Sequence, residues 1–492
     1  MFAGSLVILV LSSNPINVIL MISDGFGPSS ETFGRTIYQF KNNLPFDHPT
    51  PLDEILVGTS RTRSSSSLVT DSAAGATAFS CGLKSYNGAI GVNPNKKPCG
   101  TIFEAAKAKG LKTGLVATSR ITHATPASFS AHVVHRDMEN LIAEYQVGDY
   151  ILGPQIDLMF GGGRCHFVSN ITFSSCRNDD RNLLKEASDK GYHVINNKYQ
   201  MMTTSQLPVI GLFNNDHMSF EIDRIPDQEP SLSEMTKKAL DLLAVDSENG
   251  FILMVEGSRI GSTCFALLLD MAAHNNDPVG HASDILEYYE TVKLAKIFVE
   301  NHPSTLLISV SDHETGGLSL AKQLDPDKYP IYKWLPKPIL KAKNSIEYLA
   351  LRLVLLKNEN FDDLFEYIDK IILRHGLMID EPLLNDINQI VSATRTGNVY
   401  KIMAELSKII STSAQIGWST HGHSAVDVNL YATGYESHKL KGNIENTAIG
   451  NFIADLLNLD LQNITSILNK HDTVPSVKDV IQVRCKRIKY HS

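Results

Sequence analysis

The 492-residue chain lacks several features that would point to common classes of protein. Its 45 Lys and Arg are outnumbered by 53 Asp and Glu, so the formal net charge is -8 at pH 7. Because phosphate backbones are bound by clustered Lys and Arg, this balance argues against a nucleic-acid-binding surface. The six cysteines form no CxxC pair and no zinc-finger spacing, so a structural zinc knuckle is not expected. Beyond the first residues, no stretch is long and apolar enough to cross a membrane.

What is present describes an ordinary globular protein, with 43% hydrophobic and 20% charged residues. A chain of this length suits two or three domains, or one large α/β domain with insertions. We predict one domain over residues 17–485. The preceding residues 1–16 contain an apolar run with the length of a signal-peptide core, but no Lys or Arg comes before it. We interpret them as the remnant of a signal peptide or membrane anchor.

Two cysteines suggest an oxidising compartment. Cys165 and Cys176 bracket HFVSNITFSS, which contains the glycosylation sequon Asn170-Ile171-Thr172, and a second sequon begins at Asn463. A disulfide-closed, glycosylated surface loop would explain this arrangement, and chance sequons with two free cysteines are the alternative. We expect a glycoprotein in the lumen of the secretory pathway.

Buried strands alternate with amphipathic helices along the chain. NVILMIS, TGLVATS, GFILMVE and STLLISVS have the apolar, β-branched composition of buried strands, whereas TIFEAAKAKG, SLSEMTKKALDLL and ILEYYETVKLAKIFVENH have helical spacing. This order predicts an α/β fold with a large, mostly parallel sheet that helices cover on both faces. Between about residues 320 and 412, proline-rich turns and helical stretches predict a helical insertion.

Acidic residues follow three of the predicted strands. Asp24 comes after NVILMIS, Glu256 ends GFILMVE, and Asp312-His313 follow STLLISVS. Ligands bind at the carboxyl ends of parallel strands, so these side chains are expected at one edge of the sheet. Several carboxylates held together need a cation to offset their repulsion.

Histidines elsewhere supply further candidate ligands for zinc. Asp270 and His274 are four residues apart, a spacing that places both on one helical face, and His421 and His423 lie in THGHSAVDV. Each histidine alone is more often a structural residue than a ligand. Together with the carboxylates, they favour a metal centre.

Ser72 is the candidate nucleophile. It opens SAAGATAFSCG after Thr70 and Asp71, which places its hydroxyl at the start of a helix, where backbone N–H groups favour phosphate. A simple helix-capping role is the alternative. No GxSxG surrounds Ser72, which excludes the nucleophile elbow of the α/β-hydrolases, and no triad partner is evident. This favours activation by metal.

Six motifs in order closely resemble the alkaline phosphatases: NVILMISDG, TDSAAGATA, HATPASFSAH, MVEGSRI, SDHETGG and THGHSAVDV. KSYNGAIGV and GLFNNDHMSFEIDR look most like the fungal vacuolar-type branch, and the resemblance runs from Asn17 to about Leu459. It implies a metal-dependent hydrolase of many small or peptide phosphomonoesters that uses two zinc ions and one magnesium ion. It also implies a homodimer, anchored in the vacuolar membrane or secreted.

Site roles also follow from this resemblance. Ser72 would form a phosphoseryl intermediate, and Arg136 would clamp the substrate phosphate. Asp24 would bridge the second zinc and the magnesium. The other expected ligands are Asp312 and His313 for the second zinc, Thr125 and Glu256 for the magnesium, and Asp270, His274 and His423 for the first zinc. His123 would be a neighbour of the magnesium. His421 would be a neighbour of the first zinc, because His423 has the family spacing of four residues before Asp427.

Two rival functions remain open. A sulfatase or nucleotide pyrophosphatase would share similar metal ligands, but TDSAAGATA and VEGSRI favour a monoesterase, and Ser72 lacks the C/S-x-P/A-x-R setting of a sulfatase. A catalytically impaired relative that keeps the fold is the second rival.

The impaired rival arises from nine extra residues, GSTCFALLL at Gly261–Leu269. In the family pattern, VEGSRI runs directly into D-x-x-x-H, whereas here this segment separates Glu256 from Asp270. It could loop outward, displace the first-zinc ligands, or be a retained intron that is absent from the mature protein. Met271 is a second departure, because histidine is common at this position in the family.

Overall fold

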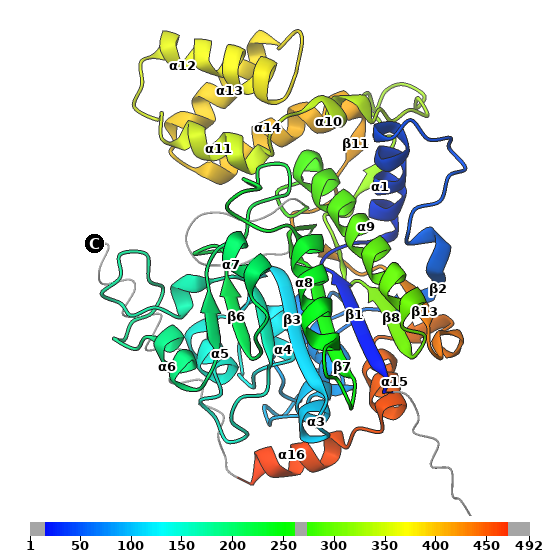
Figure 1. The fold of residues 1–492 in the computed structure, drawn as a ribbon. Helices are drawn as coiled ribbons and strands as arrows, with labels where there is room; N and C mark the ends of the chain where they lie inside the picture. The colour runs from blue at the N-terminus through cyan, green and yellow to red at the C-terminus, as the bar shows by residue number, and fades with distance from the viewer. Residues whose placement is uncertain (1–14, 261–272, 471–492) are drawn as a thin grey trace, which may run out of the picture.

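The computed structural model describes residues 15–260 and 273–470. Within them, ten strands form one sheet in the order β14-β2-β13-β8-β1-β7-β3-β4-β6-β5 (Figure 1). In the described part of the sheet, β13 is antiparallel to β2 and β8, and the other neighbouring strands are parallel, as predicted. The strands are β1 (Asn17–Ser23), β2 (Leu56–Arg61), β3 (Lys112–Arg120), β4 (Leu158–Gly162), β5 (His193–Ile195), β6 (Val209–Leu212), β7 (Phe251–Gly257), β8 (Thr305–Val310), β13 (Val428–Gly434) and β14 (Gly442–Glu445).

Helices cover both faces of the sheet, which confirms the predicted fold class. In β1, Ile19 and Met21 enter one core and Val18, Leu20 and Ile22 enter the other. Because alternate residues are buried on opposite faces, the central strands have uninterrupted apolar sequences. The first face packs against α1 (Pro28–Lys41), α8 (Leu232–Ala244) and α9 (Pro278–Asn301), and the second against α2 (Ser72–Cys81), α3 (Ile102–Ala108) and α15 (Thr447–Leu457).

Short elements connect these layers. Two small antiparallel sheets pair β9 with β12 and β10 with β11. The remaining elements outside the predicted insertion are α4 (Ala124–Ser128), α5 (Glu139–Gln146), α6 (Leu183–Asp189), α7 (Lys198–Thr203), α16 (Leu461–Asn469), β9 (Glu314–Thr315), β10 (Ser319–Leu320), β11 (Ile416–Gly417), β12 (His423–Ser424) and the single turns η1 (Asp53–Ile55), η2 (Arg164–His166), η3 (Ser258–Ile260) and η5 (Ser437–Lys439).

The region predicted as a helical insertion has turns and irregular chain over residues 321–336 and is mostly helical from Lys337 to Ala414. We call residues 337–414 the helical insertion; it is drawn in yellow and orange in Figure 1 and gathers at one end of the molecule. Buried apolar side chains such as Leu349, Ile390 and Leu406 form its interior. Its elements are α10 (Lys337–Lys341), α11 (Ile346–Val354), α12 (Phe361–Tyr367), the π-helical η4 (Ile368–Gly376), α13 (Leu384–Arg395) and α14 (Val399–Ala414).

Two disulfides close short loops. Cys165 is bonded to Cys176, as the sequence suggested, and Cys81 is bonded to Cys99, which the sequence analysis did not anticipate. A search of the described residues finds no helix with the length and apolar character needed to span a bilayer. Most of the expected N-terminal remnant, the extra segment Gly261–Leu269, Asp270 and Met271 lie outside the described residues.

Candidate metal and phosphate site

Three neighbouring strands bring the predicted acidic residues together. The sheet order β8-β1-β7 places the strand ends side by side, with Ile22 of β1 paired with Glu256 of β7 and with Val310 of β8. Potential ligand atoms of Asp24, Asp312 and His313 all lie within 4.8 Å of one another. Atoms of Asp24, Glu256 and His123 do the same. Asp24 therefore belongs to both groups.

The Glu256 group fits a cation. Glu256 Oε2 accepts hydrogen bonds from Ser258 (2.6 Å) and Ser119 (3.2 Å), whereas Oε1 has no hydrogen-bond partner among the described residues. The fully buried Thr125 hydroxyl of α4 likewise makes no hydrogen bond to the described residues. Burial, together with the nearby Asp312 carboxylate, raises the pKa of Glu256 to about 7. A cation bound here would offset the cost of burying these oxygens.

His274 and His423 fit a shared cation even more closely. Their Nε2 atoms are 3.1 Å apart, while His274 Nδ1 donates to the backbone oxygen of His421 and His423 Nδ1 donates to that of Thr70. Burial lowers the pKa of His274 to about 3 and that of His423 well below its usual value, so both rings are neutral. With each Nδ1 carrying the proton, two Nε2 lone pairs face each other. Such an arrangement repels unless a cation lies between the rings.

The surroundings of these two histidines differ in part from the prediction. His274 was expected on a helical face with Asp270, but it lies in the turn 273–276 before α9. The sequence spacing was misleading, because the helix begins only at Pro278, after the capping residue Asp277. His421 lies beside the pair, where its Nδ1 donates to the backbone oxygen of His274 (2.7 Å).

Ser72 begins helix α2, and Asp71 is the capping residue. The Asp71 carboxylate accepts a hydrogen bond from Ala74 N (3.0 Å), so the capping role considered for Ser72 is not supported. Ser72 Oγ is instead 3.0 Å from His313 Nε2, which joins it to the Asp24 group. Helix α2 can approach this closely because a Cβ on Gly75 would lie 3.0 Å from Asp312 Cβ.

Arg136 lies beside the start of α2. Its guanidinium donates to Asp71 Oδ2 (3.2 Å) and to His123 Nε2 (2.8 Å). Asp71 also accepts a hydrogen bond from Gly88 N, which fixes the carboxylate. The ion pair of Asp71 with Arg136 was missed from the sequence, and His123 was expected only as a neighbour of the magnesium, not as a hydrogen-bond partner of Arg136. Their only signals were the position of Asp71 next to Ser72 and of His123 two residues before Thr125.

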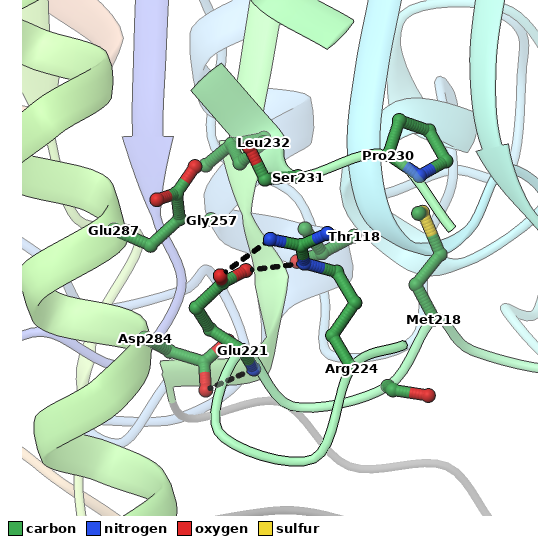
Figure 2. Close-up of a pocket in the computed structure, with 11 residues that line it drawn as sticks. Thr118, Met218, Glu221, Arg224, Pro230, Ser231, Leu232, Gly257, Asp284 and Glu287 are labelled. Atoms are coloured by element: carbon green, nitrogen blue, oxygen red, sulfur yellow. Dashed lines mark hydrogen bonds and ion pairs between the residues drawn. The ribbon is translucent and has the colours of Figure 1, made fainter. Parts of the chain in front are cut away.

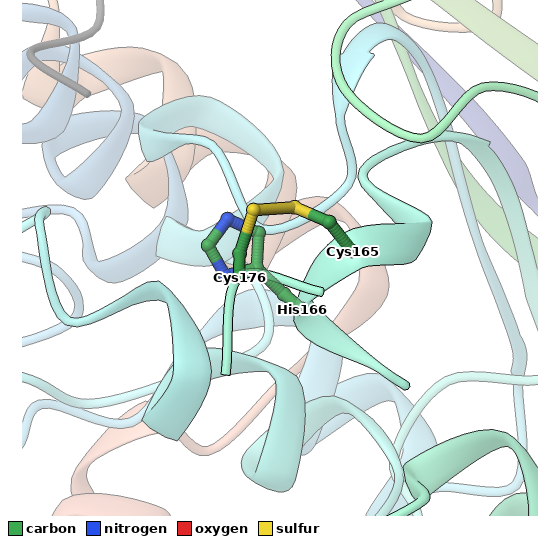
Figure 3. A group of neighbouring side chains, drawn as sticks. All are labelled: Cys165, His166 and Cys176. Carbon is green, nitrogen blue, oxygen red and sulfur yellow. A yellow bond between two sulfur atoms is a disulfide. The ribbon is translucent and has the colours of Figure 1, made fainter. Parts of the chain in front are cut away.

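Two other clusters do not compete with this site. Cys165, His166 and Cys176 have the spacing of metal ligands, but the disulfide removes both thiolates (Figure 3). A cavity beside Gly257 is lined by Glu221, Asp284 and Glu287, and Arg224 forms a two-point ion pair with Glu221 (Figure 2). Its volume of about 10 Å³ admits one water rather than a phosphomonoester.

Known proteins are similar to this chain in sequence and fold over most of their length. The family model for alkaline phosphatase matches residues 16–459. An alkaline phosphatase of Schizosaccharomyces pombe is 48% identical over 93% of this chain and 84% of its own length, and the repressible alkaline phosphatase of Saccharomyces cerevisiae is 42% identical over 95% and 86%. The crystal structure of a cold-active alkaline phosphatase from a psychrophilic Shewanella is 32% identical, with a TM-score of 0.76 over 90% of this chain and all of that one. This chain is therefore a member of the alkaline phosphatase family of phosphomonoester hydrolases.

Proposed function

We propose that the enzyme transfers the phosphoryl group of a broad range of phosphomonoesters first to Ser72 and then to water. The observation that carries this proposal is the pair of facing Nε2 lone pairs on His274 and His423, next to a group that joins Ser72, His313 and Asp24. Such donors suit a metal-dependent phosphatase rather than a Ser-His-Asp hydrolase. A binding protein without catalysis has no need of a serine at this position.

We assign the metal ligands as follows. Asp24, Asp312 and His313 would hold one zinc, His274 and His423 with Asp270 would hold the other, and Asp24, Thr125 and Glu256 would hold magnesium. Imidazole and carboxylate donors suit zinc, and all-oxygen donors suit magnesium. When bound, these ions lower the pKa of the attacking hydroxyl and stabilise the leaving oxygen.

The protein side chains perform the remaining work. Arg136 binds two phosphate oxygens through its planar fork, and Asp71 and His123 hold that fork in place. As Ser72 Oγ forms a bond to phosphorus, the ester bond breaks and an alcohol leaves. Water then attacks phosphorus, the bond to Oγ breaks, and inorganic phosphate and the serine hydroxyl are regenerated. N–H groups at the start of α2 favour the negative charge in both steps.

The extra segment leaves an impaired enzyme as the alternative. Asp270 follows that segment and lies outside the described residues. The convergence of His274 with His423 favours an active enzyme, because two of the three expected first-zinc ligands meet despite the extra residues.

We further propose that the protein is a glycoprotein of the secretory pathway and acts as a homodimer. Its proposed location is the vacuole, with an N-terminal segment that anchors it in the membrane. The two disulfides and the exposed sequon residues Asn170 and Asn463 support an oxidising compartment and glycosylation. The repressible yeast relative supports the fungal branch.

The test measures metal and phosphate on the purified enzyme. About two zinc ions per chain and release of phosphate from a chromogenic monoester at alkaline pH are expected. Ser72→Ala should retain its metals and lose turnover and phosphoserine labelling, whereas Ser65→Ala, at an exposed serine in the preceding loop, should match the wild type. Turnover by Ser72→Ala at the wild-type rate would refute the assigned nucleophile. A wild-type protein that binds its full metal content and has no turnover would establish the impaired alternative.

A further inference from the structure

The helical insertion contacts the stretch of chain that carries His274. Asp277, three residues after His274, is fully buried, and its carboxylate accepts hydrogen bonds from backbone N–H groups at the start of two helices. Its Oδ1 accepts from Val279 (2.9 Å) and Gly280 (3.0 Å) at the start of α9. Its Oδ2 accepts from Ile346 N (2.8 Å), the first residue of α11 in the helical insertion. One carboxylate thus joins the N-termini of both helices, where negative charge is favoured.

A second connection is made just before the extra segment. Arg259 of η3 is three residues after Glu256 and is 3% exposed. It donates to Glu347 Oε1 (2.8 Å) in the first turn of α11, and its guanidinium stacks over Phe220 at 4.0 Å. The next residue, Ile260, is held through its backbone oxygen by His281 Nδ1 of α9 (3.0 Å). Residues on both sides of the extra segment are therefore tied to α9 and α11.

The helical insertion also leads into the segment that carries His423. Helix α14 ends at Ala414 and continues directly through β11 to Trp418, whose indole donates back to Ser411 (3.1 Å). The same helix contacts the turn 273–276 that carries His274, because Ser407 Oγ donates to the backbone oxygen of Asn276. Helix α14 thus contacts the turn that carries His274 and leads into the chain segment that carries His423.

These contacts favour a positioning role over a purely stabilising one. A buried ion pair such as Arg259–Glu347 contributes little more to stability than well-packed apolar side chains of the same volume. It does, however, restrict geometry, because the planar guanidinium and the carboxylate must meet at a set orientation. Metal ligands need such support, since small displacements weaken binding.

We propose that Asp277 and Glu347 are positioning residues for the first zinc, and that the helical insertion serves to hold His274 against His423. This inference depends on the proposed function, because it assumes that the two histidines bind zinc. Neither residue contacts the reacting atoms. Their effect is transmitted through the backbone from the start of α11 to the turn 273–276.

Asp277→Asn is the sharpest perturbation. Asparagine caps helices as well as aspartate does, so its amide oxygen can still cap α9. Its amide nitrogen cannot accept the hydrogen bond from Ile346 N, so the connection to α11 is lost selectively. Glu347→Gln is a second variant that weakens the connection at Arg259. Glu366→Gln is the matched control, because Glu366 pairs with Lys370 on the exposed surface of the same helical insertion.

The measurement is zinc bound per chain, by elemental analysis, over a series of zinc-buffered solutions, with magnesium affinity and circular dichroism recorded in parallel. Loss of a supporting contact should weaken one zinc about 10- to 100-fold in Asp277→Asn and Glu347→Gln. The second zinc, magnesium and the folded spectrum should be unchanged, and added zinc should restore kcat. Glu366→Gln should match the wild type throughout.

Unchanged zinc affinity in Asp277→Asn and Glu347→Gln would overturn the inference. It would also be overturned if both variants unfolded and lost zinc and magnesium together. A wild-type protein that binds no zinc would instead overturn the proposed function, and the inference with it. The zinc titration of the wild type therefore separates the two failures.

Discussion

Replacing Glu139 with glutamine tests how much a buried charge pair contributes next to the site. Glu139 is 5% exposed and accepts hydrogen bonds from Arg120 Nε (2.8 Å), a second Arg120 nitrogen (3.0 Å) and Thr122 Oγ1 (2.6 Å). Although burial opposes ionisation, the charge of Arg120 holds the pKa of Glu139 well below its usual range. These contacts fix the turn between β3 and His123.

The expected cost follows from the burial of both partners. Arg120 is 4% exposed, so Glu139→Gln replaces its buried carboxylate partner with a neutral amide and leaves only the partly exposed Asp216 carboxylate at the guanidinium. Removing one partner of a buried ion pair costs about 3–5 kcal/mol of unfolding free energy. Asp216→Asn provides the matched control, because Asp216 pairs with the same guanidinium at 2.5 Å but its side chain is 43% exposed. An exposed ion pair contributes only about 0–1 kcal/mol.

The assay is urea unfolding, monitored by circular dichroism, in saturating zinc and magnesium so that metal binding is equal in all samples. Glu139→Gln should lower the unfolding free energy several times more than Asp216→Asn. Equal losses in the two variants, or a loss below about 1 kcal/mol for Glu139→Gln, would refute the claim that burial decides the contribution of each pair.

Two further predictions concern stability. His132 Nε2 lies 2.8 Å from buried Glu104; burial alone lowers the pKa of His132, but the carboxylate outweighs it and the pKa is raised. A histidine whose pKa is raised by folding stabilises the protein fully below pH 6.5, and this stability is lost as the pH rises through the pKa of the folded state. His132→Gln should therefore lower the unfolding free energy more at acidic than at alkaline pH. A larger loss at alkaline pH, measured by urea unfolding, would contradict this. Cys165 and Cys176 are 11 residues apart, so the double variant Cys165→Ala/Cys176→Ala should lose about 3 kcal/mol of unfolding free energy, measured by urea unfolding. An unchanged unfolding free energy would show that the disulfide does not restrict the unfolded chain.

Local sequence predicted the elements that carry the site. The apolar runs NVILMIS and GFILMVE correspond to the observed strands β1 (Asn17–Ser23) and β7 (Phe251–Gly257), because residues buried on both faces need no polar alternation. The acids that follow these strands meet, since parallel strands end at one edge of the sheet. The start of helix α2 at Ser72 was likewise expected from its composition.

Other parts of the site depend on contacts between distant segments. The turn at His274 was wrongly predicted as a helix from the four-residue spacing of Asp270 and His274. Such a spacing is not unique to helices. Cys81 and Cys99 were not paired in advance, since spacing alone does not identify which cysteines meet. The partners of Glu139 were equally hidden, because any buried carboxylate can pair with many arginines.

The type of sheet, the edge at which the site forms and the residue types of the site can all be predicted from the sequence, because strand burial and motif order are local properties. How those residues face one another depends on the packing of the whole chain. His274 meets His423 across 149 residues, and Asp277 meets Ile346 across 69. Such contacts form only when the whole chain has packed, since a lone pair or a backbone N–H carries no local signal of the partner that it will find.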